Sequence, residues 1–314
     1  MPESIASTAS PATGQIDPAL VARGIRSRSL RKSLELDGGY LSQSCSSAEI
    51  LAVLYTRLMR LGPSIAPPMP PPYSGVPGPD NPGHFPGDRY NGPHTPELDR
   101  FIFSPTHYSL SLYCALVEVG RLDAAALDLV EVDGHVMERI GAEHSPGIAV
   151  TSGSFGQSLS QAAGIAFARR EKGETGHTWI FMSDGELQEG QTWETVASCS
   201  FHGIDNLTAI IDVNGQQCDG EMESIMQTEP IVERLEAFGA NVLEIDGNDI
   251  DALTAIPEAR APGKTLFVVA RTNPMCGMPE LEPRLPELHY VIFSDPDEKQ
   301  RFERRLSLLE GAVS

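Results

Sequence analysis

The stretch from position 178 to position 214 constrains the fold of this chain more than any other. It begins with an apolar run that is typical of a buried strand, and this run stops at Ser183-Asp184-Gly185. A segment with helical periodicity follows, and a second apolar run stops at Asn214-Gly215. Parallel strands joined by one crossover helix open on the same edge of a sheet, so we expect Asp184 and Asn214 to meet there. Their oxygens are suited to Mg²⁺ or Ca²⁺ held against a diphosphate.

Strand-like and helix-like segments alternate along most of the chain. We expect helices over 18–36, 46–59, 108–119, 190–201, 229–238, 249–259 and 297–309, and strands over 179–182, 207–213, 241–245 and 265–271. Ser46 or Ser47 is the expected cap of the second helix. Strands that alternate with helices in this way predict an α/β fold, with a mostly parallel sheet covered by helices on both faces.

The length of 314 residues allows either two domains or one large α/β domain, and the composition indicates two irregular segments. Residues 1–16 are rich in Ser, Ala, Thr and Pro, so we expect a disordered tail followed by a domain over 17–314. A Pro/Gly-rich insertion at about 63–96 cannot sustain a helix or a central strand, and we expect it to be a functional lid or disordered.

Charge and cysteine usage exclude several functional classes. The chain has 43 acidic and 23 basic residues, a net charge of −20, which argues against binding to nucleic acid or anionic membranes. No apolar run approaches the roughly 18 residues of a membrane-spanning helix, and no secretory signal is expected. The five cysteines lie far apart without any C-x-x-C pair, which indicates neither a zinc site nor a disulfide framework. We therefore expect reduced thiols in a cytoplasmic protein.

The metal-binding pattern resembles that of a known group of enzymes. An Asp-Gly followed about thirty positions later by Asn, as at Asp184 and Asn214, is similar to the diphosphate-binding signature of thiamine-diphosphate enzymes, although Ser183 replaces the usual Gly. Two segments resemble sequences of the transketolase family specifically, namely GELQEGQTWE and DNLTAIIDVNG. The resemblance implies thiamine diphosphate and Mg²⁺ (with Ca²⁺ as an alternative), held by Asp184, Asn214 and a backbone carbonyl near Gln216. The alternative for each dipeptide alone is a plain turn.

A second block, VTSGSFGQSLSQAAGIAFAR over 150–169, resembles the family's Thr-Thr-Gly-Ser-Leu-Gly-Gln-Gly-Leu segment. The resemblance implies that the cofactor is lined by Gly153, Ser154, Phe155 and Gly185. Glu189 matches a family glutamate found at the subunit interface beside the cofactor. Its alternative is a solvated carboxylate at the start of a helix, where the helix dipole favours negative charge.

Three histidines occupy places that resemble family motifs. His107 follows the segment 99–104, which is similar to the family's Asp-Arg-Phe strand. Gly134-His135 partly matches a Gly-His-Pro motif, with His144 as a rival, and His289 follows a Pro-rich segment. The resemblance implies that His107, His135 and His289 handle protons and hydroxyl groups of a sugar, with His107 also beside the cofactor. The alternative for each is a capping or surface histidine.

The chain also departs from the family pattern where substrates are bound. Tyr40 stands in place of a family histidine, Pro105 and Thr106 replace Lys-Gly, and the loop 273–277 lacks the family's basic residues. These changes leave open a two-carbon transferase for a non-standard ketose or for specialised biosynthesis.

The resemblance covers about residues 20–300, which correspond only to the N-terminal part of a full-length transketolase. The missing part includes the pyrimidine-binding domain, whose glutamate activates the cofactor. The resemblance therefore implies the N-terminal subunit of a split transketolase, in a heterotetramer of two such chains and two C-terminal, pyrimidine-binding subunits. The expected reaction transfers a two-carbon ketol unit from a ketose or ketose phosphate to an aldose. A non-catalytic regulatory subunit is the alternative, which the retained Asp184 and Asn214 disfavour.

Overall fold

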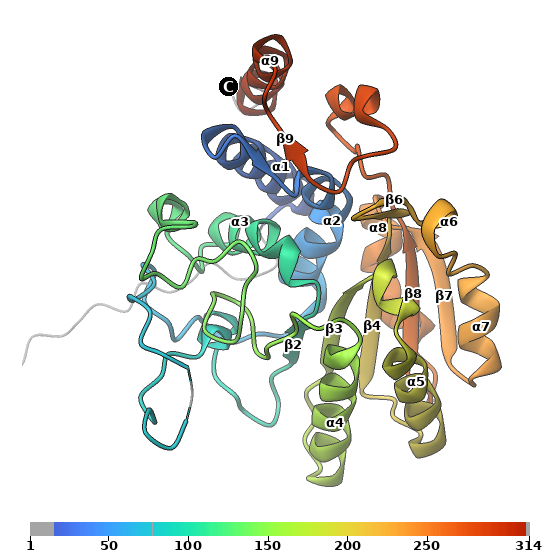
Figure 1. Cartoon of the computed structure of the whole chain (residues 1–314). Coiled ribbons are helices and arrows are strands. Elements are labelled where there is room, and N and C mark those ends of the chain that lie inside the picture. The colour runs from blue at the N-terminus through green and yellow to red at the C-terminus, as the bar shows by residue number, and fades with distance from the viewer. Residues whose placement is uncertain (1–15, 77, 312–314) are drawn as a thin grey trace, which may run out of the picture.

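A five-stranded parallel sheet forms the centre of the molecule in the computed structural model, which describes residues 16–76 and 78–311 (Figure 1). In spatial order the strands are β2 (Arg100–Phe103), β3 (Thr178–Ser183), β4 (Leu207–Val213), β8 (Leu266–Arg271) and β7 (Asn241–Asp246). Every neighbouring pair is parallel. The predicted α/β fold with a parallel sheet is therefore confirmed. Except for Ile16, the predicted tail lies outside the described residues.

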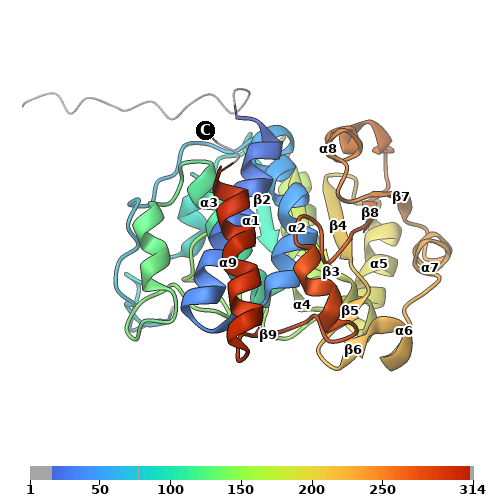
Figure 2. The ribbon, with the colours of Figure 1, turned by 90° about the horizontal axis from the view of Figure 1, so that it is seen from above.

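Both faces of the sheet are buried because side chains alternate between two hydrophobic clusters. Phe101, Phe103 and Trp179 belong to the cluster under four helices, α1 (Pro18–Glu35), α2 (Leu41–Val53), α3 (Ser109–Glu118) and α8 (Ile250–Thr254). Ile102 and Ile180 belong to the opposite cluster, under α4 (Gln157–Glu171), α5 (Gly190–His202) and α7 (Ile231–Ala237). Figure 2 shows the helices on both sides of the sheet. Strands buried on both faces explain the nearly continuous apolar runs in the sequence.

A third hydrophobic cluster joins the C-terminal part of the chain to the first two helices. Helix α9 (Pro296–Gly311) packs along α1, and the two-residue strand β9 (Val291–Ile292) pairs with β1 (Gly38–Gly39). Buried side chains in this cluster come from both ends of the chain. Further short elements are β5 (Gln216–Gln217), β6 (Gly220–Glu221) and α6 (Met222–Ile225). No helix in the described parts of the chain is long and apolar enough to cross a membrane.

Two predicted helices differ from the structure. Helix α2 begins at Leu41 rather than at Ser46, and it continues as a π-helical turn over Leu54–Leu58. Every residue of α2 is buried, and the Ser47 hydroxyl donates to the carbonyl of Gln43 at 2.6 Å instead of capping a helix start. The predicted helix over 249–259 is divided into α8 and a 3₁₀ segment, Ile256–Ala259, that contains Pro257. Proline lacks the N–H that a continuous α-helix needs there.

The Pro/Gly-rich insertion packs against the rest of the molecule over its described residues. It contains one 3₁₀ segment, Gly87–Asn91, and its side chains Phe85 and Tyr90 belong to the main hydrophobic cluster. The amide of Gly87 donates to the carbonyl of Glu143 at 2.7 Å, and a Cβ at Gly87 would clash with backbone atoms of Ser145. The insertion is thus a packed loop, because its buried aromatic residues anchor a backbone that cannot form regular structure.

Candidate functional site

The ends of β3 and β4 bring Asp184 and Asn214 together. The two strands pair in parallel with Ser183 opposite Asp212, so the chain leaves both strands on the same edge of the sheet. The amide of Gly215 donates to Oδ2 of Asp184 at 2.8 Å, and the amide of Gln216 donates to Oδ1 of Asn214 at 2.9 Å. Asp184 is 2% exposed and Asn214 is 7% exposed. Both oxygen-bearing side chains are therefore held by the same short turn.

Two adjoining cavities open at this edge and share Asp184 and Gln216. The first has a volume of about 510 Å³, and the second, of about 440 Å³, also contains Asn214. Of the predicted site residues, the first cavity is lined by His107, Gly153, Phe155, Asp184, Gly185, Glu189, Gln216 and His289. These residues come from places that are far apart along the chain, and only the folded sheet edge assembles them.

Two predicted site residues do not line either cavity. Ser154 is exposed, and His135 forms an isolated β-bridge with Pro72 of the insertion. The rival His144 is buried, with its ring 4.7 Å from that of Tyr73. The loop that carries both histidines pairs with the insertion, and neither histidine lines the two cavities.

The backbone at position 183 explains why serine can replace the glycine that is usual in the diphosphate-binding signature. Ser183 adopts an extended conformation with φ of −100°, which requires no glycine. Its amide donates to Oε2 of Glu186 at 2.9 Å as part of a capping box, and the hydroxyl of Ser104 donates to Oε1 of the same carboxyl. Burial raises the pKa of Glu186 to about 7. The carboxyl of Glu186 thus fixes the backbone on which Asp184 is presented.

The residues at the strand ends fit a divalent cation and a diphosphate. Burial raises the pKa of Asp184 to about 8, with a smaller contribution from the nearby carboxyl of Asp212, so this group lacks a compensating positive charge. No lysine or arginine is among the described residues that line the first cavity. Arg271, in the second, is already paired with Glu229 and Glu244.

A diphosphate in these cavities would therefore require a metal ion to balance its charge. The described residues contain no group of three or more His, Cys, Asp or Glu side chains that could hold a metal. The side chains at the strand ends instead offer one carboxylate, of Asp184, and one amide oxygen, of Asn214. Such a small set is suited to Mg²⁺, which is commonly bound through one or two carboxylates together with phosphate and water oxygens.

Glycines open the wall of the first cavity. A Cβ at Gly153 would meet nothing within 4 Å, and one at Gly185 would touch only the ring of Phe155, at 3.7 Å. Gly156 has φ of +81°, and a Cβ there would approach the Cβ of Glu189 to 2.7 Å. A side chain at Gly156 would push on the start of α5, so glycine is needed there for both backbone and packing reasons.

Aromatic and imidazole rings form the opposite wall. The ring of His107 lies 5.2 Å from that of His289 and 5.5 Å from that of Phe155. Tyr40 packs edge-on to both histidines, with ring centroids 5.4 and 5.3 Å away. Burial, and secondarily the neighbouring His289, lowers the pKa of His107 to about 3, and burial lowers the pKa of His289. Both imidazoles are therefore neutral at neutral pH, and each has a ring nitrogen that can accept a hydrogen bond.

Sequence reasoning missed the residues beneath Asn214. Nδ2 of Asn214 contacts Tyr108, Asp212 and Ser46, which are all buried. Burial raises the pKa of Asp212 despite four hydrogen-bond donors to its carboxyl. The one signal available in the sequence is an aspartate inside the otherwise apolar strand Leu207–Val213.

Comparisons with known proteins agree with this geometry. Residues 88–284 match the family model described as "Transketolase, thiamine diphosphate binding domain". A transketolase family protein of Sinorhizobium fredii (y4mO) is 33% identical over 281 residues, covering 88% of this chain and 90% of that protein. The 6-deoxy-6-sulfo-D-fructose transketolase subunit SqwG of Clostridium sp. is 32% identical, covering 82% of this chain and 85% of that protein.

One of the subunits of the apulose-4-phosphate transketolase of Actinobacillus succinogenes is 30% identical, covering 81% of this chain and 83% of that protein. Among solved structures, the transketolase of Campylobacter jejuni superposes with a TM-score of 0.69 at 21% identity. That superposition covers 94% of this chain but only 46% of the other, so this chain spans about half the length of the solved relative and shares its fold over that half.

Proposed function

This chain belongs to the transketolase family, and we propose that it is the diphosphate-binding subunit of a transketolase assembled from two different polypeptides. The observation that carries the proposal is the similarity to relatives that are themselves named as subunits. The chain is 32% identical to one of them and 30% identical to another, and it covers 85% and 83% of their lengths. A partner carrying the pyrimidine-binding half completes the enzyme.

The proposed reaction is the transfer of a two-carbon ketol unit from a ketose or ketose phosphate to an aldose. When bound, thiamine diphosphate supplies the electron sink that allows the carbon–carbon bond beside a ketose carbonyl to break and re-form. Within this chain Asp184, Asn214 and the carbonyl near Gln216 hold Mg²⁺ (or Ca²⁺), which neutralises the diphosphate. Gly153, Phe155 and Gly185 accept the ring system, because no side chain lies beside Gly153 and only the ring of Phe155 lies beside Gly185.

The histidines of this chain act on protons of the sugar. His107 and His289 line the same cavity and are neutral, so a ring nitrogen of either is proposed to hydrogen-bond a sugar hydroxyl and to hold its proton as that hydroxyl reacts. His107 is buried and His289 is half-buried beside this cavity. Glu189, at the exposed start of α5 beside the cavity, is placed to meet the partner subunit. His135 receives no role in this scheme because it lies outside both cavities.

The substrate is proposed to be a ketose outside the ordinary pentose and hexose phosphates. Tyr40 packs against both His107 and His289, and the described lining of the first cavity contains no lysine or arginine to attract a phosphate. Two relatives are named for unusual ketoses, 6-deoxy-6-sulfo-D-fructose and apulose 4-phosphate, which supports this choice. We place the enzyme in the cytoplasm, where its scattered cysteines stay reduced.

The proposal is tested by reconstitution. The chain is purified alone and together with the candidate pyrimidine-binding subunit, and each sample is assayed with thiamine diphosphate, Mg²⁺ and a panel of ketose donors and aldehyde acceptors. We expect ketol transfer only from the pair. Robust turnover by this chain alone contradicts the two-polypeptide assembly, and a pair that binds the cofactor but transfers nothing favours a regulatory subunit.

A further inference from the structure

A small group of buried side chains supports the amide of Asn214 from below. This group, which we call the brace, consists of Ser46 from α2, Tyr108 from the start of α3, and Asp212 from β4. Nδ2 of Asn214 lies 2.9 Å from the hydroxyl of Tyr108, and 3.3 Å from both the Ser46 hydroxyl and Oδ2 of Asp212. All three brace residues are almost completely buried, so water does not compete for these contacts.

Both hydroxyl groups of the brace donate to the carboxyl of Asp212. The hydroxyl of Ser46 donates to Oδ2 of Asp212 at 2.6 Å, and the hydroxyl of Tyr108 donates to the same oxygen at 3.0 Å. Each hydroxyl has a single hydrogen, so the Tyr108 oxygen is left as an acceptor toward Asn214. The brace therefore presents acceptors to Asn214 and can receive only the NH₂ end of its carboxamide.

The opposite end of the carboxamide is fixed as a consequence. With Nδ2 on the brace, Oδ1 of Asn214 lies on the other side, where it accepts the amide of Gln216 at 2.9 Å. A carbonyl oxygen has two lone pairs, so one remains for a cation. A rotated carboxamide would place its NH₂ group at the cation and its oxygen against the acceptors of the brace, and both contacts are unfavourable.

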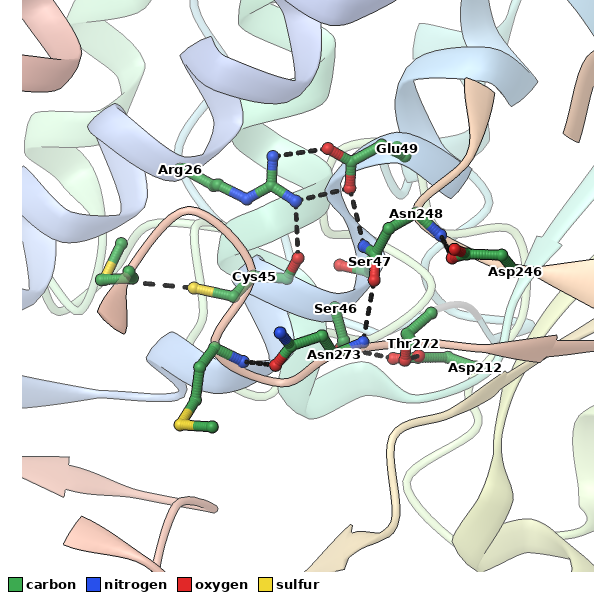
Figure 3. A network of polar contacts seen from close by, with 12 residues as sticks. Arg26, Cys45, Ser46, Ser47, Glu49, Asp212, Asp246, Asn248, Thr272 and Asn273 are labelled. Carbon is green, nitrogen blue, oxygen red and sulfur yellow. Dashed lines mark hydrogen bonds and ion pairs between the residues drawn. The ribbon is translucent and has the colours of Figure 1, made fainter. Parts of the chain in front are cut away.

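The brace is itself anchored to distant parts of the fold, as Figure 3 shows. Thr272, at the end of β8, donates its hydroxyl to Oδ1 of Asp212. The next residue, Asn273, donates its amide to Asn248, whose side chain donates to Glu49 at 3.0 Å. Glu49 in turn pairs with Arg26 of α1 in a buried ion pair. Side chains from two helices and the ends of β4, β7 and β8 thus hold the carboxyl of Asp212 in one position.

We propose that Tyr108 and Asp212 are positioning residues, which orient the carboxamide of Asn214 so that its oxygen is directed to the metal ion. This inference rests on the proposed function, because the ion is the one that site would hold. Neither residue touches the ion or the cofactor. Partners of this kind, one step removed from a metal, typically change metal affinity by about 10- to 100-fold when they are removed.

Tyr108→Phe tests the inference with little change in packing. Phenylalanine keeps the ring that contacts Phe181 and His107, and removes only the hydroxyl. The matched control is Tyr113→Phe on the same helix, because the Tyr113 hydroxyl is also buried and donates to the carbonyl of Glu138 at 2.9 Å, outside the brace. The full chain with its partner subunit is titrated with Mn²⁺ in the presence of thiamine diphosphate, and bound Mn²⁺ is followed by electron paramagnetic resonance.

We expect Tyr108→Phe to raise the Kd for Mn²⁺ by about 10- to 100-fold, and Tyr113→Phe to change it less than about twofold. Thermal unfolding of both variants is measured alongside, because Tyr108→Phe loses its contacts with Asp212 and Asn214, and Tyr113→Phe loses its contact with Glu138. Equal Mn²⁺ affinities in the two variants overturn the inference. Absence of Mn²⁺ binding in the wild type, or wild-type binding by Asp184→Ala, instead overturns the proposed function itself.

A second pair of variants distinguishes an effect on the orientation of the Asn214 carboxamide from a general effect on stability. In Asn214→Asp both ends of the side chain are oxygens, so the brace no longer has an orientation to select. Adding Tyr108→Phe to this background should then raise the Kd for Mn²⁺ by less than about twofold, against 10- to 100-fold in the Asn214 background. The same increase in the Kd for Mn²⁺ in both backgrounds would show that Tyr108 supports the local structure only, and would overturn the inference. Asp212→Asn, which adds a competing NH₂ group to the brace, should behave like Tyr108→Phe.

Discussion

The amide of Gly215 donates to Oδ2 of Asp184 at 2.8 Å, which ties the turn after β4 to the first residue after β3. The two residues are 31 positions apart in sequence, and their contact fixes the geometry of both strand ends. Because Asn214 and Gln216 lie on the same turn, a change at Asp184 affects every proposed metal ligand of this chain.

The first prediction concerns the metal. Asp184→Ala removes the only carboxylate of the proposed ligand set and the acceptor of Gly215, so Mg²⁺-dependent binding of thiamine diphosphate by the assembled enzyme should be abolished. Isothermal titration calorimetry with and without Mg²⁺ measures this. Asp133→Ala, at an exposed carboxylate, is the control and should bind as the wild type does. Unchanged cofactor affinity in Asp184→Ala would remove this residue from the metal site.

The second prediction concerns His107. His107→Ala should leave cofactor affinity nearly unchanged and lower turnover by about 10²- to 10⁴-fold, the usual reach of general acid–base catalysis. Steady-state kinetics of the assembled enzyme and calorimetry of cofactor binding measure the two quantities separately. His94→Ala is the control, because His94 is exposed and pairs with Asp88 in the insertion. Wild-type turnover in His107→Ala would assign His107 a structural role.

The third prediction concerns stability in acid. Burial, helped by the charges of Arg260 and Arg169, lowers the pKa of His177 from 6.5 to about 3. Between these values the unfolded chain binds a proton that the folded chain does not, so the free energy of unfolding falls as the pH falls. The slope contributed by this one group approaches about 1.4 kcal/mol per pH unit.

His177→Gln removes that group and should make the free energy of unfolding less dependent on pH between about pH 6 and pH 4. The variant loses the contact of His177 with Thr208, so it should be less stable than the wild type at pH 7. Urea denaturation at several pH values gives both curves. The similar shift at His107 is present in both proteins and cancels in the comparison. Parallel curves for the two proteins would contradict the lowered pKa.

The fourth prediction concerns assembly. We expect two copies of this chain to combine with two copies of the partner, since closed two-fold symmetry is the common arrangement of oligomers. Large apolar side chains are exposed on the isolated chain, with Phe201 86% exposed, so the chain alone should self-associate at high concentration. Analytical ultracentrifugation of the chain, alone and with its partner, measures the masses. A stable one-to-one complex would contradict the tetramer.

The local pattern of the sequence determined four strands of the central sheet and the place of the proposed metal ligands. Strand β4 occupies the predicted residues 207–213, and the predicted crossover helix differs from α5 by one residue at its end. Asp184 and Asn214 could be placed at strand ends because an apolar run followed by a Gly-containing turn is a signal carried by neighbouring residues alone.

Only the tertiary structure decided which residues surround those ligands. His107, His289 and Tyr40 come from distant parts of the chain, and they meet because α2, α3 and the C-terminal segment pack together over one edge of the sheet. The brace of Ser46, Tyr108 and Asp212 arises in the same way. His135 had a short motif in its favour, but the pairing of its loop with the insertion placed it elsewhere. Hydrophobic periodicity specifies which face of a segment is buried, whereas contacts between distant side chains depend on how the buried faces fit together in three dimensions.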